Sequence, residues 1–137
     1  MKPDFSGEYR LDRRASTLSS GASAVETAEM RVEHREPLFH MWGKFVANGK
    51  TLIEYSFELV ADGPEVALGE NDVSRLYWEG DALVSEFRSG TPDSVVTMSW
   101  RYELIDSGRR LRATEQIRGG GRDQDNRWEF ERRAATG

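Results

Sequence analysis

The sequence contains no cysteine and no long hydrophobic run among its 137 residues. The absence of cysteine excludes a disulfide scaffold, a thiolate zinc site and a cysteine nucleophile. No apolar stretch approaches the roughly 18 residues of a membrane-spanning helix, so we expect no membrane span. The length predicts a single domain over residues 1–133, followed by a frayed tail over residues 134–137.

An excess of basic residues is also absent, since 19 Lys and Arg stand against 24 Asp and Glu, giving a net charge of −5. Nucleic-acid binding needs a basic surface to neutralise phosphates, so we expect no nucleic-acid partner. The N-terminus has no apolar segment of the signal-peptide kind, which predicts a cytoplasmic location. The composition leaves the oligomeric state open.

Most of the chain alternates apolar and polar residues with period two, and turn signals recur about every ten residues. This pattern predicts an all-β fold, a single antiparallel up-and-down barrel of about ten strands. The small polar residues of Arg13–Glu26 predict a loop or one helical turn. The expected strands are Gly7–Arg13, Glu26–Arg35, Leu38–Val46, Lys50–Val60, Glu65–Leu68, Val73–Glu79, Ala82–Arg88, Ser94–Ile105, Arg110–Arg118 and Asn126–Arg133.

Side-chain parity predicts the pairing of three hairpins, because a slip of one residue moves every side chain to the other face. A three-residue loop over Ala47–Gly49 keeps one face of its hairpin purely apolar. Two-residue loops at 80–81 and 107–108 likewise separate an aromatic face from a charged face. The expected pairs are Phe45–Thr51, Trp78–Leu83, Arg75–Glu86, Tyr102–Ala113 and Glu103–Arg112.

Three short motifs resemble the calycin superfamily, which contains the lipocalins and the fatty-acid-binding proteins. Phe5–Asp12 resembles the first strand, with Gly7-x-Tyr9 in place of Gly-x-Trp. Trp78–Val84 is similar to the Trp-Asp-Gly hairpin of the fatty-acid-binding group, and Trp128–Arg133 to the closing strand. Their order is closest to small bacterial lipocalin-like proteins of unassigned function. The resemblance implies a calycin-like barrel whose closed end is plugged by Tyr9.

The sequence departs from the fatty-acid-binding pattern in two places. That group closes with an Arg-x-Tyr motif that grips a carboxylate, whereas here the strand reads Arg127-Trp128-Glu129-Phe130. Arg127 falls on the outer parity, so the clamp is not carried over. The group also has a helix–turn–helix lid after the first strand, and Arg13–Glu26 is too short for two helices.

The inner face of the expected barrel is aromatic and carries one carboxylate, Glu115, opposite Trp100. A carboxylate facing an apolar interior either accepts hydrogen bonds from buried donors or has its pKa raised by desolvation. Glu115 therefore binds a ligand's hydroxyl, amine or cation, or accepts hydrogen bonds from the hydroxyls of Tyr9, Tyr55 or Tyr102, or lies at the solvated rim of the barrel. The residues expected to bind a ligand are Glu115, Trp100, Tyr102, Tyr55, Trp78, Phe57, Phe45 and Met41.

The only two histidines, His34 and His40, flank the Glu36-Pro37 turn. A metal site needs three or four converging ligands. Parity sets His34 opposite Phe39 and sends His40 to the outer face, so the two rings point apart. We therefore expect two partly exposed hairpin residues, no metal and no cofactor.

The sequence favours binding of a small hydrophobic or amphipathic molecule in the barrel interior over catalysis. One alternative is an enzyme of the isomerase or cyclase type on the same barrel, with Glu115 as general acid or base. Another is a filled barrel that contacts a protein through the outer apolar residues Trp42, Val46 and Leu52. An outer apolar patch would favour the last alternative.

Overall fold

The structure, a computed structural model, describes residues 2–91, 93–121 and 123–133, so the tail expected over 134–137 lies outside the described residues. It contains ten strands and one short 3-10 turn, η1. Among the described residues, no helix is long and apolar enough to cross a membrane. The elements are β1 (Gly7–Leu11), β2 (Thr27–Arg35), β3 (Leu38–Ala47), β4 (Lys50–Val60), β5 (Val66–Ala67), β6 (Asp72–Glu79), β7 (Ala82–Thr91), β8 (Ser94–Ile105), η1 (Asp106–Gly108), β9 (Arg110–Arg118) and β10 (Gln124–Arg133).

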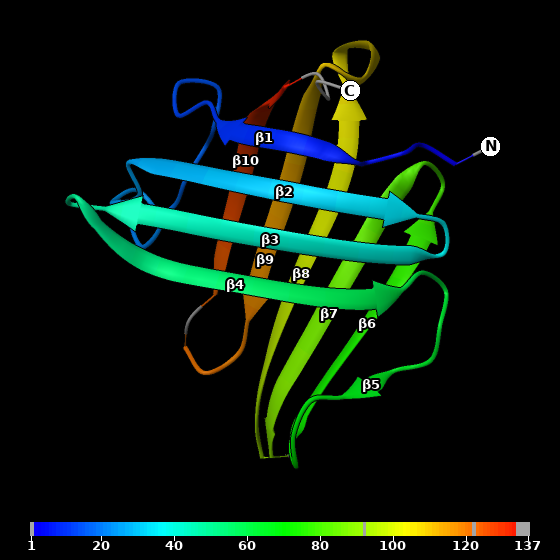
Figure 1. Ribbon diagram of the computed structural model, residues 1–137. Helices are drawn as coiled ribbons and strands as arrows, with labels where there is room; N and C mark the ends of the chain where they lie inside the picture. The colour runs from blue at the N-terminus through cyan, green and yellow to red at the C-terminus, as the bar shows by residue number, and fades with distance from the viewer. Residues whose placement is uncertain (1, 92, 122, 134–137) are drawn as a thin grey trace.

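All ten strands belong to one antiparallel sheet in the order β4-β3-β2-β1-β10-β9-β8-β7-β6-β5. Figure 1 shows β1–β4 crossing in front of β6–β10 at a steep angle, so the sheet curls round and packs against itself. The first and last strands lie side by side in the middle of the sheet. The predicted all-β up-and-down architecture is confirmed, although several strand ends differ by two or three residues.

The barrel closes at one end only. The chain at the end of β4 meets β6, where Ala61 bridges Leu76 in parallel and the Asp62 amide donates to the Leu76 carbonyl at 2.8 Å. Towards the β3–β4 hairpin the two edges diverge, and β5 has only two residues (Figure 1).

The predicted parity of the hairpins is confirmed, but one loop prediction is wrong. The β6–β7 and β8–β9 hairpins pair as expected. The β3–β4 turn is a two-residue Asn48-Gly49 loop, in which both residues have positive φ, and Phe45 pairs with Ile53 instead of Thr51. A bulge next to Phe45 restores the register. The extra residue, Leu52, keeps the later apolar residues of β4 on the inner face.

The residues between β1 and β2 form a cap without a helix, as predicted. The chain turns once at Ser19, whose carbonyl accepts the amides of Ala22 and Ser23. The first half of this segment lies along β10, where Thr17 and Arg127 exchange backbone hydrogen bonds of 2.8 Å. The cap therefore holds Ala22 above one end of the barrel.

Candidate functional site

A cavity of about 410 Å³ lies inside the barrel beneath the cap. Its mouth is apolar and open to solvent, since Leu52 is 63% exposed and Leu68 is 58% exposed. Ala22 and Val25 of the cap also line the cavity, and both are buried. The deeper lining is mainly aromatic, and it comes from both crossing halves of the sheet. Its size and composition are those of a small-molecule site.

Glu115 on β9 lies at this cavity, buried and opposite Trp100 on β8, as parity predicted. Its Oε1 atom accepts hydrogen bonds from Asn126 Nδ2 at 3.0 Å and from Trp128 Nε1 at 3.1 Å. The structural acceptor role expected for Glu115 is therefore partly right, but its donors are these two residues and not tyrosine hydroxyls. Burial raises the pKa of Glu115, and the two hydrogen bonds oppose that rise.

Asn126 is the residue of this cluster that the sequence analysis missed. It is buried beside Glu115 on β10, and its Oδ1 accepts the Ser19 amide at 2.6 Å. Asn126 thus connects the carboxylate to the cap. The period-two parity that placed Trp128 inside also places Asn126 inside, so this signal was present in the sequence.

Two tyrosine hydroxyls lie near Glu115, and the acceptors of their hydrogen bonds are methionine sulfur atoms, which accept weakly. Tyr55 and Tyr102 both point their hydroxyls at the Met41 sulfur, at 3.8 and 3.7 Å. The Tyr55 ring packs directly against Gly43. A β-carbon at position 43 would lie only 2.4 Å from the ring, so a larger residue would leave no room for it. Glycine at this position lets Tyr55 reach across β3 into the interior.

Six of the eight residues expected to bind a ligand line the cavity. The structure brings together Glu115, Trp100, Tyr102, Tyr55, Phe57 and Phe45. Met41 lies outside this lining, fully buried against the two tyrosine hydroxyls. Trp78 is also outside it, because its indole packs beside Phe5 and His34 at the opposite end of the barrel. That any of these eight residues binds a ligand stays a prediction.

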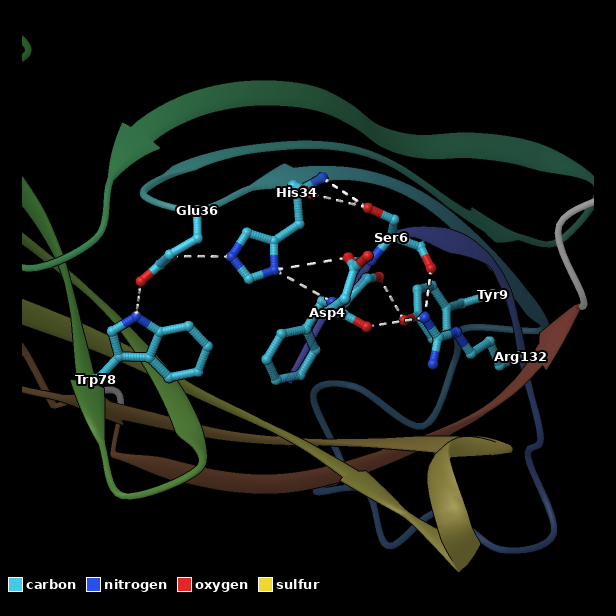
Figure 2. Close-up of polar contacts among 8 residues, drawn as sticks. Asp4, Ser6, Tyr9, His34, Glu36, Trp78 and Arg132 are labelled. Atoms are coloured by element: carbon cyan, nitrogen blue, oxygen red, sulfur yellow. Dashed lines mark hydrogen bonds and ion pairs between the residues drawn. The ribbon is translucent and has the colours of Figure 1, made fainter. Parts of the chain in front are cut away.

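The end of the barrel near Trp78 is closed by the N-terminal segment (Figure 2). The Phe5 amide donates to His34 Nδ1 at 3.1 Å, and His34 Nε2 lies 3.1 Å from Glu36 Oε1. The Trp78 indole donates to the other oxygen of Glu36 at 2.7 Å. Because Nδ1 accepts the Phe5 amide, the ring hydrogen lies on Nε2, and Nε2 donates a hydrogen bond to Glu36 Oε1. The partly exposed position expected for His34 is wrong, since Phe5 and Trp78 cover the ring.

Replacing His34 by phenylalanine should lower the free energy of unfolding by about 1–3 kcal/mol, because the buried Phe5 amide loses its acceptor. Urea denaturation measures this loss. His40→Phe is the matched control: His40 lies on the outer face, stacked on Trp42 at 3.6 Å. It should change stability by less than about 0.5 kcal/mol. Equal effects of the two substitutions would contradict a role for the Phe5–His34 bond.

A second hollow, of about 480 Å³, lies on the outer face of β1–β4. Its charged side chains face opposite charges across neighbouring strands: Glu8 pairs with Arg31, and Arg10 with Glu29. Such alternating pairs stabilise the sheet and leave little unbalanced charge for a ligand. The inner cavity is therefore the stronger candidate site.

The outer apolar residues proposed for protein contact do not form one patch. Trp42 stacks on the ring of His40, and the guanidinium of Arg31 lies 4.1 Å from its indole centroid. Leu52, displaced by the bulge, contributes to the mouth of the cavity. These contacts divide the predicted surface between two regions.

No family model and no curated protein matches the sequence. Solved structures do match in fold. The REP1-NXSQ fatty acid transporter is 15% identical with a TM-score of 0.61, covering 94% of this chain and 96% of that chain. Human cRBP IV is 16% identical with a TM-score of 0.65, covering 96% and 99%. A secretory abundant heat soluble protein from Ramazzottius varieornatus is 10% identical with a TM-score of 0.64, covering 96% and 98%.

These likenesses extend over nearly the whole chain and define a calycin-like fold. The fold expected from the Gly7-x-Tyr9 and Trp78–Val84 motifs is therefore confirmed. At these identities the comparison describes the fold and leaves the ligand to be argued from the cavity.

Proposed function

We propose that this protein binds a small hydrophobic or amphipathic molecule inside its barrel. The observation that carries the proposal is the aromatic cavity of about 410 Å³, which opens to solvent beside the exposed residues Leu52 and Leu68. A ligand that fills it removes apolar surface from water, at roughly 25 cal/mol per Å². Fatty-acid-binding proteins among the structural neighbours, including one from Drosophila melanogaster, support the proposal.

The surroundings of Glu115 favour binding over acid–base catalysis. Its two hydrogen-bond donors are an amide of Asn126 and the indole of Trp128. Neither group acts as an acid or a base near neutral pH, so neither relays a proton to or from the carboxylate. Both hold the carboxylate in one orientation, which suits recognition of a polar group on a ligand.

Binding is tested with N-phenyl-1-naphthylamine, a neutral apolar dye whose emission rises on burial. Ser85 is a buried lining residue on β7, so Ser85→Leu adds volume to the cavity. It should weaken dye binding roughly tenfold, since overpacking costs about 1–3 kcal/mol. Fluorescence titration measures the dissociation constant.

The matched control is Ser99→Leu on β8. Ser99 lies between Glu86 and Gln116 on the outer face, so the same added volume should leave dye affinity unchanged. Urea denaturation of both variants checks that they are folded. Equal affinity of Ser85→Leu and the wild type would place the dye elsewhere, and no emission change with the wild type would contradict the proposed function.

A further inference from the structure

The charge of the cavity lining restricts the ligands that it can hold. Among the described residues that line it, Glu115 is the only one with a formal charge; none of the lining residues is a lysine, arginine or histidine. A bound carboxylate would have no cation beside it and would add a second negative charge to a poorly solvated interior. Like charges at short range are costly there.

One oxygen of Glu115 is available to a ligand. Both hydrogen bonds that the carboxylate accepts from described residues fall on Oε1, and Oε2 receives neither. Glu115 is only 7% exposed, so water solvates it poorly. A buried carboxylate with one free oxygen is stabilised by any donor or cation that reaches that oxygen.

The aromatic rings around Glu115 also favour a cation. Trp100 lies directly opposite it, and the rings of Trp100 and Trp128 are 6.3 Å apart. Tyr102 stacks on Trp100 with a ring separation of 6.2 Å. Indole and phenol rings attract ammonium groups within about 6 Å of their centroids. A carboxylate flanked by aromatic rings is thus matched to a protonated amine.

We infer that the cavity selects amphiphiles with a protonated amine head over those with a carboxylate, and that the ammonium group lies at Glu115 Oε2. This inference rests on the proposed function, because it names the head group of the molecule bound in the same cavity. The apolar tail of such a ligand fills the aromatic region towards the mouth, where Leu52 and Leu68 are exposed.

The test compares three probes with the same tail: dodecylamine, dodecan-1-ol and dodecanoic acid, each below its micelle concentration. Each probe displaces N-phenyl-1-naphthylamine from the wild type and from Glu115→Gln. The amine should bind the wild type at least about tenfold more tightly than the acid, because hydrogen bonds between charged groups are the stronger ones. In Glu115→Gln most of this preference should disappear while the alcohol binds as before.

Glu103→Gln is the control for net charge. Glu103 lies on the outer face of β8, paired with Arg112 across the hairpin, so its loss should leave the order of the three probes unchanged. The side-chain amide introduced by Glu115→Gln keeps one oxygen as an acceptor for Asn126 and Trp128, and urea denaturation verifies that the variant is folded.

The pH dependence of probe affinity gives a second test, which needs no variant. Among the described lining residues, the titratable groups near Glu115 are the hydroxyls of Tyr55 on β4 and Tyr102 on β8; burial raises both of their pKa values, and the charge of Glu115 raises them further. An alkylamine, with a pKa of about 10.4 like lysine, stays protonated throughout. As the pH falls through the pKa of Glu115, which burial raises, the carboxylate is neutralised and the advantage of amine over alcohol should fade.

The outcomes separate the two proposals. If the dye binds but the acid competes as well as the amine, the head-group inference is overturned and cavity binding stands. If Glu103→Gln abolishes the preference as Glu115→Gln does, the effect is one of net charge, which also overturns the inference. If the wild type does not bind the dye, the proposed function itself fails.

Discussion

Replacing Tyr9 by alanine should lower the free energy of unfolding by about 3–5 kcal/mol, the usual range for deleting a buried aromatic side chain. Tyr9 is 2% exposed at the closed end of the barrel, and its hydroxyl donates to the Phe5 carbonyl at 2.6 Å. The Arg132 guanidinium lies 5.9 Å from its ring. Burial raises the pKa of Tyr9 to about 12, so the hydroxyl stays neutral and keeps donating at physiological pH.

Urea denaturation measures the effect, with the denaturant slope expected to stay constant. Tyr9→Phe is the matched control, because it keeps the ring and removes only the hydrogen bond to Phe5. It should cost about 0.5–1.5 kcal/mol. A loss below about 1 kcal/mol for Tyr9→Ala would show that the ring does not plug the barrel as the structure has it.

Replacing Trp128 by alanine should lower the free energy of unfolding by a similar amount, about 3–5 kcal/mol. Trp128 lines the cavity, whereas Tyr9 lies at the closed end of the barrel. Trp128 is 3% exposed and packs edge-on against Phe45 with ring centroids 5.0 Å apart. Its indole also donates to Glu115, so the substitution removes both packing and one of two donors to a buried carboxylate. These two losses act together.

Trp128→Phe separates them, because it retains most of the ring and loses the donor. Its cost should be about 1–3 kcal/mol, and its urea midpoint should fall between those of the wild type and Trp128→Ala. The same midpoint for the alanine and phenylalanine variants would contradict a packing role and assign the stability to the hydrogen bond with Glu115.

The face of each strand was predictable because side-chain alternation is a local property of the chain. Parity alone placed Glu115 opposite Trp100 and His34 opposite Phe39. The same reasoning failed at the β3–β4 turn, where it predicted a three-residue loop, whereas the structure has a two-residue loop and a bulge beside Phe45. Both solutions keep the apolar face intact, so the alternation could not distinguish them.

The partners of Glu115 were less predictable than its orientation. Tyrosine hydroxyls were reasonable donors on parity, yet the carboxylate is held by Asn126 and Trp128 on the adjacent strand. Which inner side chains touch depends on the curl of the sheet and on rotamers, and neither follows from spacing. The burial of His34 likewise required Phe5 to fold across the closed end.

The sequence by itself determined the all-β class, the number and order of the strands, and the sorting of residues between an apolar and a charged face. These properties depend on neighbours within a few residues, where period two and turn chemistry act. Only the tertiary structure decided that the barrel closes at one end, that a cap without helices is tied to β10, and that a cavity remains. Those depend on how two halves of a curled sheet pack across the interior, which involves residues far apart in the chain.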